Sequence, residues 1–208
     1  YRAHCWRMLD ATRTGVAAES TDPADAYSGF ALSANDILRS ADGEPVAFSA
    51  RLTGASVEPE VESAWTNHLT TLFPEVRPRG HFEVRSCDAV APEWYAAPIV
   101  FVAALAYDPR ASSEAALLAA DSASLLRTAG HLGLREPSLA RTARDLFQLA
   151  LEGAARLGPA SVGGAELEAA RAFFSKYTSR DSSPADGWVL PARARSGADS
   201  PSERAVSG

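Results

Sequence analysis

The sequence predicts an α+β fold that is mostly helical. Ala- and Leu-rich stretches with apolar residues at helical spacing fill most of the second half of the chain, and one short segment in the first half alternates between polar and apolar residues as a strand does. With 208 residues, 46% hydrophobic and 22% charged, the chain has the size and apolar content of one domain with a core. This composition excludes disordered, collagenous and disulfide-scaffold proteins.

The first half of the chain is expected to contain short elements joined by turns. Asp22 can cap a helix, and Pro23 can occupy the first turn of that helix. A second helix should stop before Pro74, because the residue before a proline avoids the helical region. The expected elements are a turn near residues 13–15, a helix over 22–38, a short strand around 46–48, a loop over 52–60 and a helix over 61–72.

The second half begins with the alternating segment, residues 80–86, which predicts a strand. The longest apolar run, residues 96–106, has about half of the ~20 residues that a membrane span needs, so we expect a buried helix and no membrane partner. Residues 191–208 have no periodicity, and this predicts a disordered tail. Helices are expected over residues 92–107, over 111–157 with a break at 130–133, and over 164–177.

Charge and cysteine content narrow the range of functions. Twenty basic and 26 acidic residues give a net charge of -6, the opposite sign to that needed for nucleic-acid binding, so no nucleic-acid partner is expected. Cys5 and Cys87 lack a metal-ligand spacing and, with no secretory signal in the sequence, predict reduced thiols in a cytoplasmic protein. The chain starts at Tyr1 within sequence that looks structured, which favours a fragment without its amino-terminal half.

The alternating segment carries the strongest chemical signal. Its period of two places His81, Glu83 and Arg85 on one face, and we expect Phe82 and Val84 on the other face to pack against the flanking helices. A carboxylate and a guanidinium two residues apart suit a divalent cation and a substrate carboxylate, respectively. An ordinary amphipathic strand with a solvated polar face remains the alternative.

A loop bracketed by prolines leads into this strand. Arg77 and Arg79 lie in the run HLTTLFPEVRPRG, where arginines on a stiffened loop can clamp phosphate or carboxylate, although they can equally be surface charges. His68 follows Trp65 by three residues on the preceding helix, a position more typical of a packed histidine than of a base. The sequence contains neither a phosphate-binding glycine loop nor a nucleophile elbow.

Several motifs occur together in a fixed order. They are RAHCW and RTG near the start, then HLTTLFPEVRPRG and FEVRSCD, and later SRDSSPAD. This series resembles the carboxy-terminal half of glutamate–cysteine ligases of the plant and bacterial type, including the actinobacterial enzymes that feed ergothioneine synthesis. The resemblance covers residues 1–187, which it implies are the carboxy-terminal part of a catalytic domain, followed by a tail over 188–208. It also implies a fold similar to glutamine synthetase, with an antiparallel sheet curved around a funnel-shaped site and helices outside.

The resemblance also implies a reaction and a set of site residues. ATP would phosphorylate the side-chain carboxylate of glutamate, and the amine of cysteine would attack the acyl phosphate to give γ-glutamylcysteine, ADP and phosphate, with magnesium ions bridging the phosphates. Glu83 would be a magnesium ligand. Arg85 would hold the α-carboxylate of glutamate or the transferring phosphate, and Arg77 would act with it in catalysis. Arg77, Arg13 and Thr14 would also contact substrate.

Other functions stay open at this point. The remaining metal and nucleotide carboxylates of the resembled family lie in its first half, so these 208 residues are not expected to catalyse anything alone. The product could serve glutathione or ergothioneine synthesis. The alternatives are another carboxylate–amine ligase of the same fold, with a different amine, or a truncated, non-catalytic relic that acts as a helical interaction module.

Overall fold

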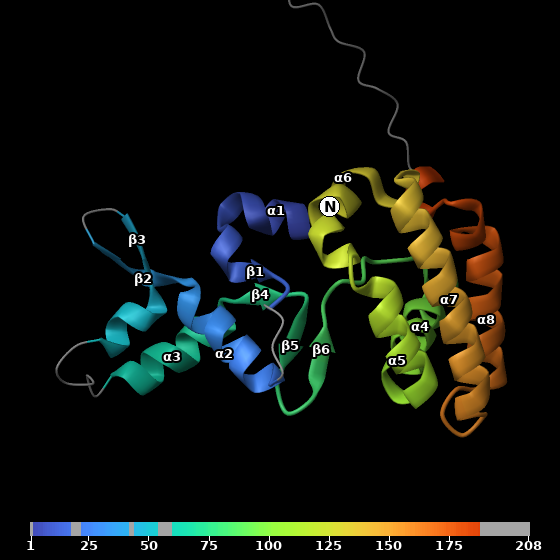
Figure 1. The fold of residues 1–208 in the computed structure, drawn as a ribbon, viewed down its shortest axis with the longest axis horizontal. Helices are drawn as coiled ribbons and strands as arrows, with labels where there is room; N and C mark the ends of the chain where they lie inside the picture. The colour runs from blue at the N-terminus through green and yellow to red at the C-terminus, as the bar shows by residue number, and fades with distance from the viewer. Residues whose placement is uncertain (1, 18–21, 42–43, 54–59, 188–208) are drawn as a thin grey trace, which may run out of the picture.

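The computed structural model describes residues 2–17, 22–41, 44–53 and 60–187. Helices predominate in these residues and the strands are short, which confirms a mostly helical α+β chain (Figure 1). The tail predicted over 188–208, and residues 54–59 of the loop predicted over 52–60, lie outside the described residues. The helices are α1 (Arg2–Leu9), α2 (Pro23–Ser33), α3 (Val61–Thr70), α4 (Ala96–Tyr107), α5 (Pro109–Ala119), α6 (Leu126–Leu132), α7 (Pro137–Leu157) and α8 (Gly164–Lys176).

The described strands pair two by two. The glutamine-synthetase-like sheet implied by the resemblance is larger than any of these pairs, and it stays a prediction. The pairs are β1 (Thr14–Gly15) parallel to β4 (Phe73–Pro74), β2 (Asn35–Ala41) antiparallel to β3 (Glu44–Ala47), and β5 (Val76–Pro78) antiparallel to β6 (Phe82–Val84).

Helix caps explain most of the predicted boundaries. Asp22 accepts a hydrogen bond from the amide of Ala24 (2.8 Å) and Pro23 opens α2, as predicted. Asp108 ends α4 and accepts the amide of Ala111 (2.8 Å), so one residue separates two helices. The break predicted at 130–133 is confirmed, since α6 ends where Gly133 takes a φ of 54°, which glycine adopts readily.

The structure differs from the prediction in several elements. Helix α2 ends at Ser33 and not at residue 38, because Ala34 is extended and its carbonyl accepts the amide of Phe48 (2.9 Å). Helix α1 was not predicted at all. Arg77 lies in strand β5, and not in a loop, because the chain turns back and pairs β5 with β6.

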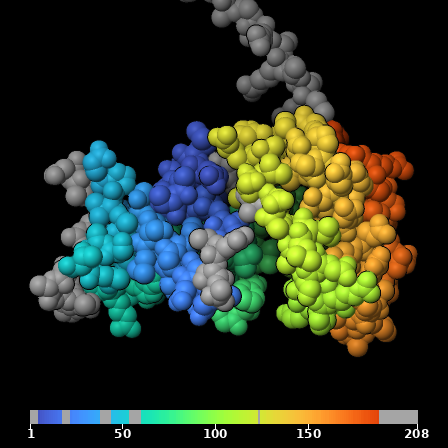
Figure 2. Space-filling view, in the orientation of Figure 1, coloured from blue at the N-terminus to red at the C-terminus, as the bar shows by residue number. Residues whose placement is uncertain are grey.

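Two separate hydrophobic clusters hold the two ends of the molecule. One lies among α4, α7 and α8, and its buried members include Val100, Ala104 and Phe147. The other joins Ala31, Ala34 and Leu72, with Trp65 packed against them. The β5–β6 hairpin lies between these two parts in Figure 1, and in Figure 2 a hollow separates the green hairpin from the yellow-green helices.

The expectation that Phe82 and Val84 are packed was also wrong. These residues are 74% and 38% exposed, because α4 packs its buried side against α7 and α8, and α2 borders this face of the hairpin only across an open pocket beside Phe82. For the same reason the run 96–106 is only half buried, and Ile99 is 66% exposed. None of the described helices is long and apolar enough to cross a membrane.

Candidate active site

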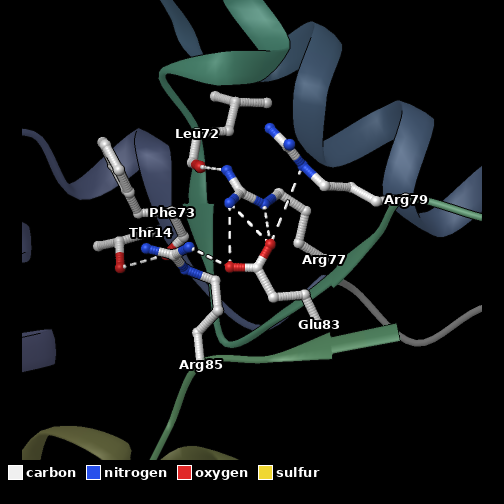
Figure 3. Close-up of polar contacts among 7 residues, drawn as sticks. All are labelled: Thr14, Leu72, Phe73, Arg77, Arg79, Glu83 and Arg85. Atoms are coloured by element: carbon white, nitrogen blue, oxygen red, sulfur yellow. Dashed lines mark hydrogen bonds and ion pairs between the residues drawn. The ribbon is translucent and has the colours of Figure 1, made fainter. Parts of the chain in front are cut away.

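Three arginines converge on one carboxylate at the β5–β6 hairpin (Figure 3). Arg77 donates to Glu83 from Nε (3.0 Å) and from Nη2, which is 2.8 Å from Oε2 and 3.0 Å from Oε1. Arg85 donates from Nη1 to Oε1 (2.6 Å). Arg79 forms a longer ion pair, with Nε 3.9 Å from Oε2. We call Arg77, Arg79, Glu83 and Arg85 the arginine cluster.

The backbone of the hairpin sets this geometry. Arg77 lies directly opposite Glu83 in the antiparallel register, so both side chains project from the same face. Gly80 takes a φ of 75° in the turn, a conformation that suits glycine. The amide of Arg85 donates to the carbonyl of Glu75 (2.8 Å), and the amide of Glu75 donates to Gly15 (2.9 Å), so the hairpin is tied to β1.

The arginine cluster carries an excess of positive charge. Hydrogen bonds from Arg77, and then those from Arg85, hold the pKa of Glu83 below its usual range, so this carboxyl stays ionised near neutral pH. Within the cluster one carboxylate faces three guanidinium groups, while the buried carboxyl of Glu75, opposite Arg85, accepts the hydroxyl of Ser86 (2.8 Å). Nε of Arg85 is buried with no hydrogen-bond partner in the described residues, and the side chain of Arg79 is 49% exposed. The arrangement therefore suits an anion, because guanidinium groups bind carboxylate and phosphate well.

In this arrangement Glu83 does not fit a magnesium ion. Both of its carboxylate oxygens already accept hydrogen bonds from guanidinium groups, and magnesium prefers several oxygen ligands in octahedral geometry. No group of three or more His, Cys, Asp or Glu side chains suited to a metal occurs in the described part of the chain. The magnesium role implied for Glu83 therefore gains no support from the ligands around it.

The predicted substrate residues divide into two groups. Arg77 and Arg85 meet at Glu83, whereas Arg13 and Thr14 lie at the β1–β4 pair. Arg13 is buried and donates to the carbonyl of Asn35 and to the hydroxyl of Thr71. The hydroxyl of Thr14 donates to the carbonyl of Phe73 (3.0 Å; Figure 3). The hydrogen bonds of Arg13 and Thr14 thus fix the backbone beside the cluster.

Phe73 is a site residue that the sequence analysis missed. The guanidinium carbon of Arg85 lies 5.4 Å from the centre of its ring, and Trp6 stacks on it with centroids 4.1 Å apart. The ring therefore holds Arg85 by a cation–π contact and links the cluster to α1. The only signal in the sequence was an aromatic residue before Pro74 inside the motif that also carries Arg77.

Arg77 and Arg79 differ in how far the protein itself binds their side chains. Its side chain is only 11% exposed, and besides Glu83 it donates from Nη1 to the carbonyl of Leu72 (3.4 Å). Each of the three guanidinium nitrogens of Arg77 thus donates to the protein itself. Among the three arginines, Arg79 and Arg85 have fewer protein partners in the described residues: Arg79 has the long ion pair with Glu83, and Arg85 donates one side-chain hydrogen bond, from Nη1.

The chain matches a known protein family. The family model described as glutamate–cysteine ligase family 2 matches residues 1–161, a stretch that contains every member of the arginine cluster. The chain belongs to this family. Membership in glutamate–cysteine ligase family 2 confirms the resemblance that the ordered motifs indicated.

Two curated relatives agree with the family model. The chain is 31% identical over 195 residues to the glutamate–cysteine ligase EgtA of Mycolicibacterium smegmatis. This match covers 89% of this chain and 44% of that protein. It is 28% identical over 183 residues to the chloroplastic glutamate–cysteine ligase of Brassica juncea. This match covers 78% of this chain and 36% of that protein. The chain therefore spans less than half the length of these two relatives.

Proposed function

We propose that the chain is part of an ATP-dependent ligase that joins the γ-carboxylate of glutamate to the amine of cysteine. The observation that carries the proposal is a hairpin with three arginines inside a stretch matched to glutamate–cysteine ligase family 2. The γ-phosphoryl group of ATP passes to the glutamate γ-carboxylate, and ADP leaves. The cysteine amine then attacks the acyl carbon, phosphate leaves, and the amine loses a proton.

The charge of the reacting species supports this proposal. Glutamate, ATP, the acyl phosphate and the released phosphate are all anions. The free donors of Arg79 and Arg85 suit a carboxylate or a phosphoryl group, and donors fixed in advance stabilise the charge of a phosphoryl-transfer transition state. Arg77 and Glu83 act as positioning residues in this scheme, because they bind each other and fix Arg85.

Other parts of the enzyme belong to the proposal as well. ATP supplies the phosphoryl group, and its magnesium would be held largely by carboxylates outside these 208 residues. Glu83 is not among the magnesium ligands in this scheme, since arginines already bind its carboxylate. The complete enzyme would have the glutamine-synthetase-like sheet, with residues 1–187 as its carboxy-terminal part. Its product would enter low-molecular-weight thiol synthesis, as a precursor of ergothioneine or glutathione.

The test is phosphate release from ATP by the protein translated from the complete reading frame that contains this chain. We expect release that requires both glutamate and cysteine, with γ-glutamylcysteine identified by mass. Release that requires a different amine would instead identify another carboxylate–amine ligase. A folded protein that releases no phosphate with any amine would contradict the proposed function.

A matched pair of variants tests the arginine cluster within that enzyme. Arg85→Lys removes the fork that can bind a carboxylate with two hydrogen bonds, so we expect at least a ~10-fold higher KM for glutamate or ATP. Arg110→Lys is the control, because Arg110 lies on an exposed helix and pairs only with Glu114 in the described residues (2.8 Å). Equal KM values for the two variants would remove Arg85 from the substrate site.

A further inference from the structure

An apolar groove runs between strand β6 and helix α4. Its volume is about 870 Å³. One wall comes from the apolar face of the hairpin, opposite to the arginine cluster, and the other comes from the outward face of α4. The main lining residues are Phe82, Val84, Pro98, Ile99, Val102 and Tyr107.

Large apolar residues along this groove are exposed to solvent. Phe82 is 74% exposed, Ile99 is 66% exposed and Tyr107 is 76% exposed. Isolated exposed apolar residues are ordinary, but a continuous set along one groove marks a surface that another group covers. The groove thus differs from a normal solvated surface.

Helix α4 provides independent support. Its twelve residues, AAPIVFVAALAY, contain no charged side chain and are apolar on every side. A helix with apolar residues on every side is buried on every side in a complete protein. Here Val100 and Ala104 pack toward α7 and α8, while the groove side of the same helix has no cover in the described residues.

The hairpin is incomplete in the same sense. Strands β5 and β6 form a sheet of two strands in the described part of the chain, and a two-stranded sheet is marginally stable unless further strands or helices cover it. Its charged face is organised around Glu83, but Phe82 and Val84 on its apolar face are exposed. A covering segment on the groove would therefore also fix the hairpin that carries the arginines.

We propose that this groove is the docking surface for the part of the same ligase that lies outside these 208 residues. The proposal rests on the proposed function, which makes the chain part of a longer enzyme. More than half of each relative has no counterpart here, since the matches cover 44% and 36% of their lengths but 89% and 78% of this chain. That remaining polypeptide is long enough to supply the cover that α4 and the hairpin lack.

The test measures the protection of groove positions in the protein translated from the complete reading frame. Ile99→Cys and Tyr107→Cys are made one at a time in a background with Cys5→Ser and Cys87→Ser, and alkylation rates are measured in native protein and in urea. Both positions are exposed in this chain, so the substitutions should not impair its folding. Leu117→Cys is the control for reagent access, since Leu117 is 80% exposed on α5 and does not line the groove.

We expect both groove cysteines to react at least tenfold more slowly in the native protein than in urea. Native rates within threefold of the urea rates would overturn the proposal, and so would a complete reading frame that adds no residues. Protection that already appears in the 208-residue chain and grows with its concentration would assign the groove to a second copy, and would also overturn it.

Ligation activity of the same protein separates this proposal from the proposed function. Protection of Ile99→Cys and Tyr107→Cys without ligation would keep the docking surface and reject the ligase. Ligation with both cysteines fully reactive would keep the ligase and reject the docking surface.

Discussion

The separation of the two hydrophobic clusters has a measurable consequence at Leu72. This side chain is fully buried in the cluster that it forms with Ala31 and Ala34. The next residue, Phe73, contacts Arg85. Leu72→Ala removes three carbons, which at about 0.8 kcal/mol per buried carbon gives about 2.4 kcal/mol in lost transfer free energy. The cavity that remains raises the expected loss toward ~4 kcal/mol.

Hydrogen exchange measured peptide by peptide can locate this loss. Because 1.4 kcal/mol is a factor of ten in an equilibrium constant, amides of α2 and α3 should exchange about 50- to 700-fold faster in the variant. Amides of α7 should be unchanged, because Phe147 and its neighbours belong to the other cluster. Leu117→Ala is the matched control, and its exposed side chain predicts a change within about 0.5 kcal/mol.

Two results would refute this reasoning. An acceleration of less than about fivefold in α2 and α3 would mean that Leu72 contributes little to that cluster. Equal acceleration in α7 would mean that the two clusters unfold as one cooperative unit, and not as separate ones.

Three further predictions concern stability. Burial, together with nearby Arg13 and Arg51, holds the pKa of His68 below its usual value, so the unfolded state binds this proton more readily than the folded state does. The urea midpoint of unfolding should therefore fall as the pH drops below about 6.5. A His68→Phe variant should lose this pH dependence. Asp108→Ala should lower the Tm more than Asp108→Asn, because asparagine can still cap α5. Gly153→Val should cost about 1–3 kcal/mol in urea unfolding, since a Cβ at Gly153 would already lie 3.1 Å from that of Ala111, and no loss of stability would contradict that close contact.

The sequence predicted the elements whose signals are local. The cap at Asp22 rests on the chemistry of one residue and its neighbours, and it is confirmed. Helix α1 was missed because it has no acidic residue in its first turn and no other start signal. The end of α2 could not be predicted either, since it depends on a hydrogen bond from Phe48 to Ala34, fourteen positions away in the chain.

The site follows the same division. Alternation correctly placed Glu83 and Arg85 together, although β6 ends at Val84 and His81 lines the groove with Phe82. The pairing of Glu83 with Arg77 depends on the register of a hairpin, which the pattern does not contain. Alternation also shows that two faces differ, and not which face is covered. For this reason the expected packing of Phe82 was wrong.

The same three-residue strand is incomplete on both faces. On one face, three guanidinium groups outnumber one carboxylate, and on the other, Phe82 and Val84 lie open. An anion would complete the first face and a covering segment the second. One short hairpin joins the two faces. A partner that holds this hairpin in place on one face therefore lowers the entropy cost of binding the other partner on the opposite face. If both proposals hold, inorganic phosphate should therefore bind more tightly to the longer ligase than to the 208-residue chain, and the Arg85→Lys substitution should weaken binding to both.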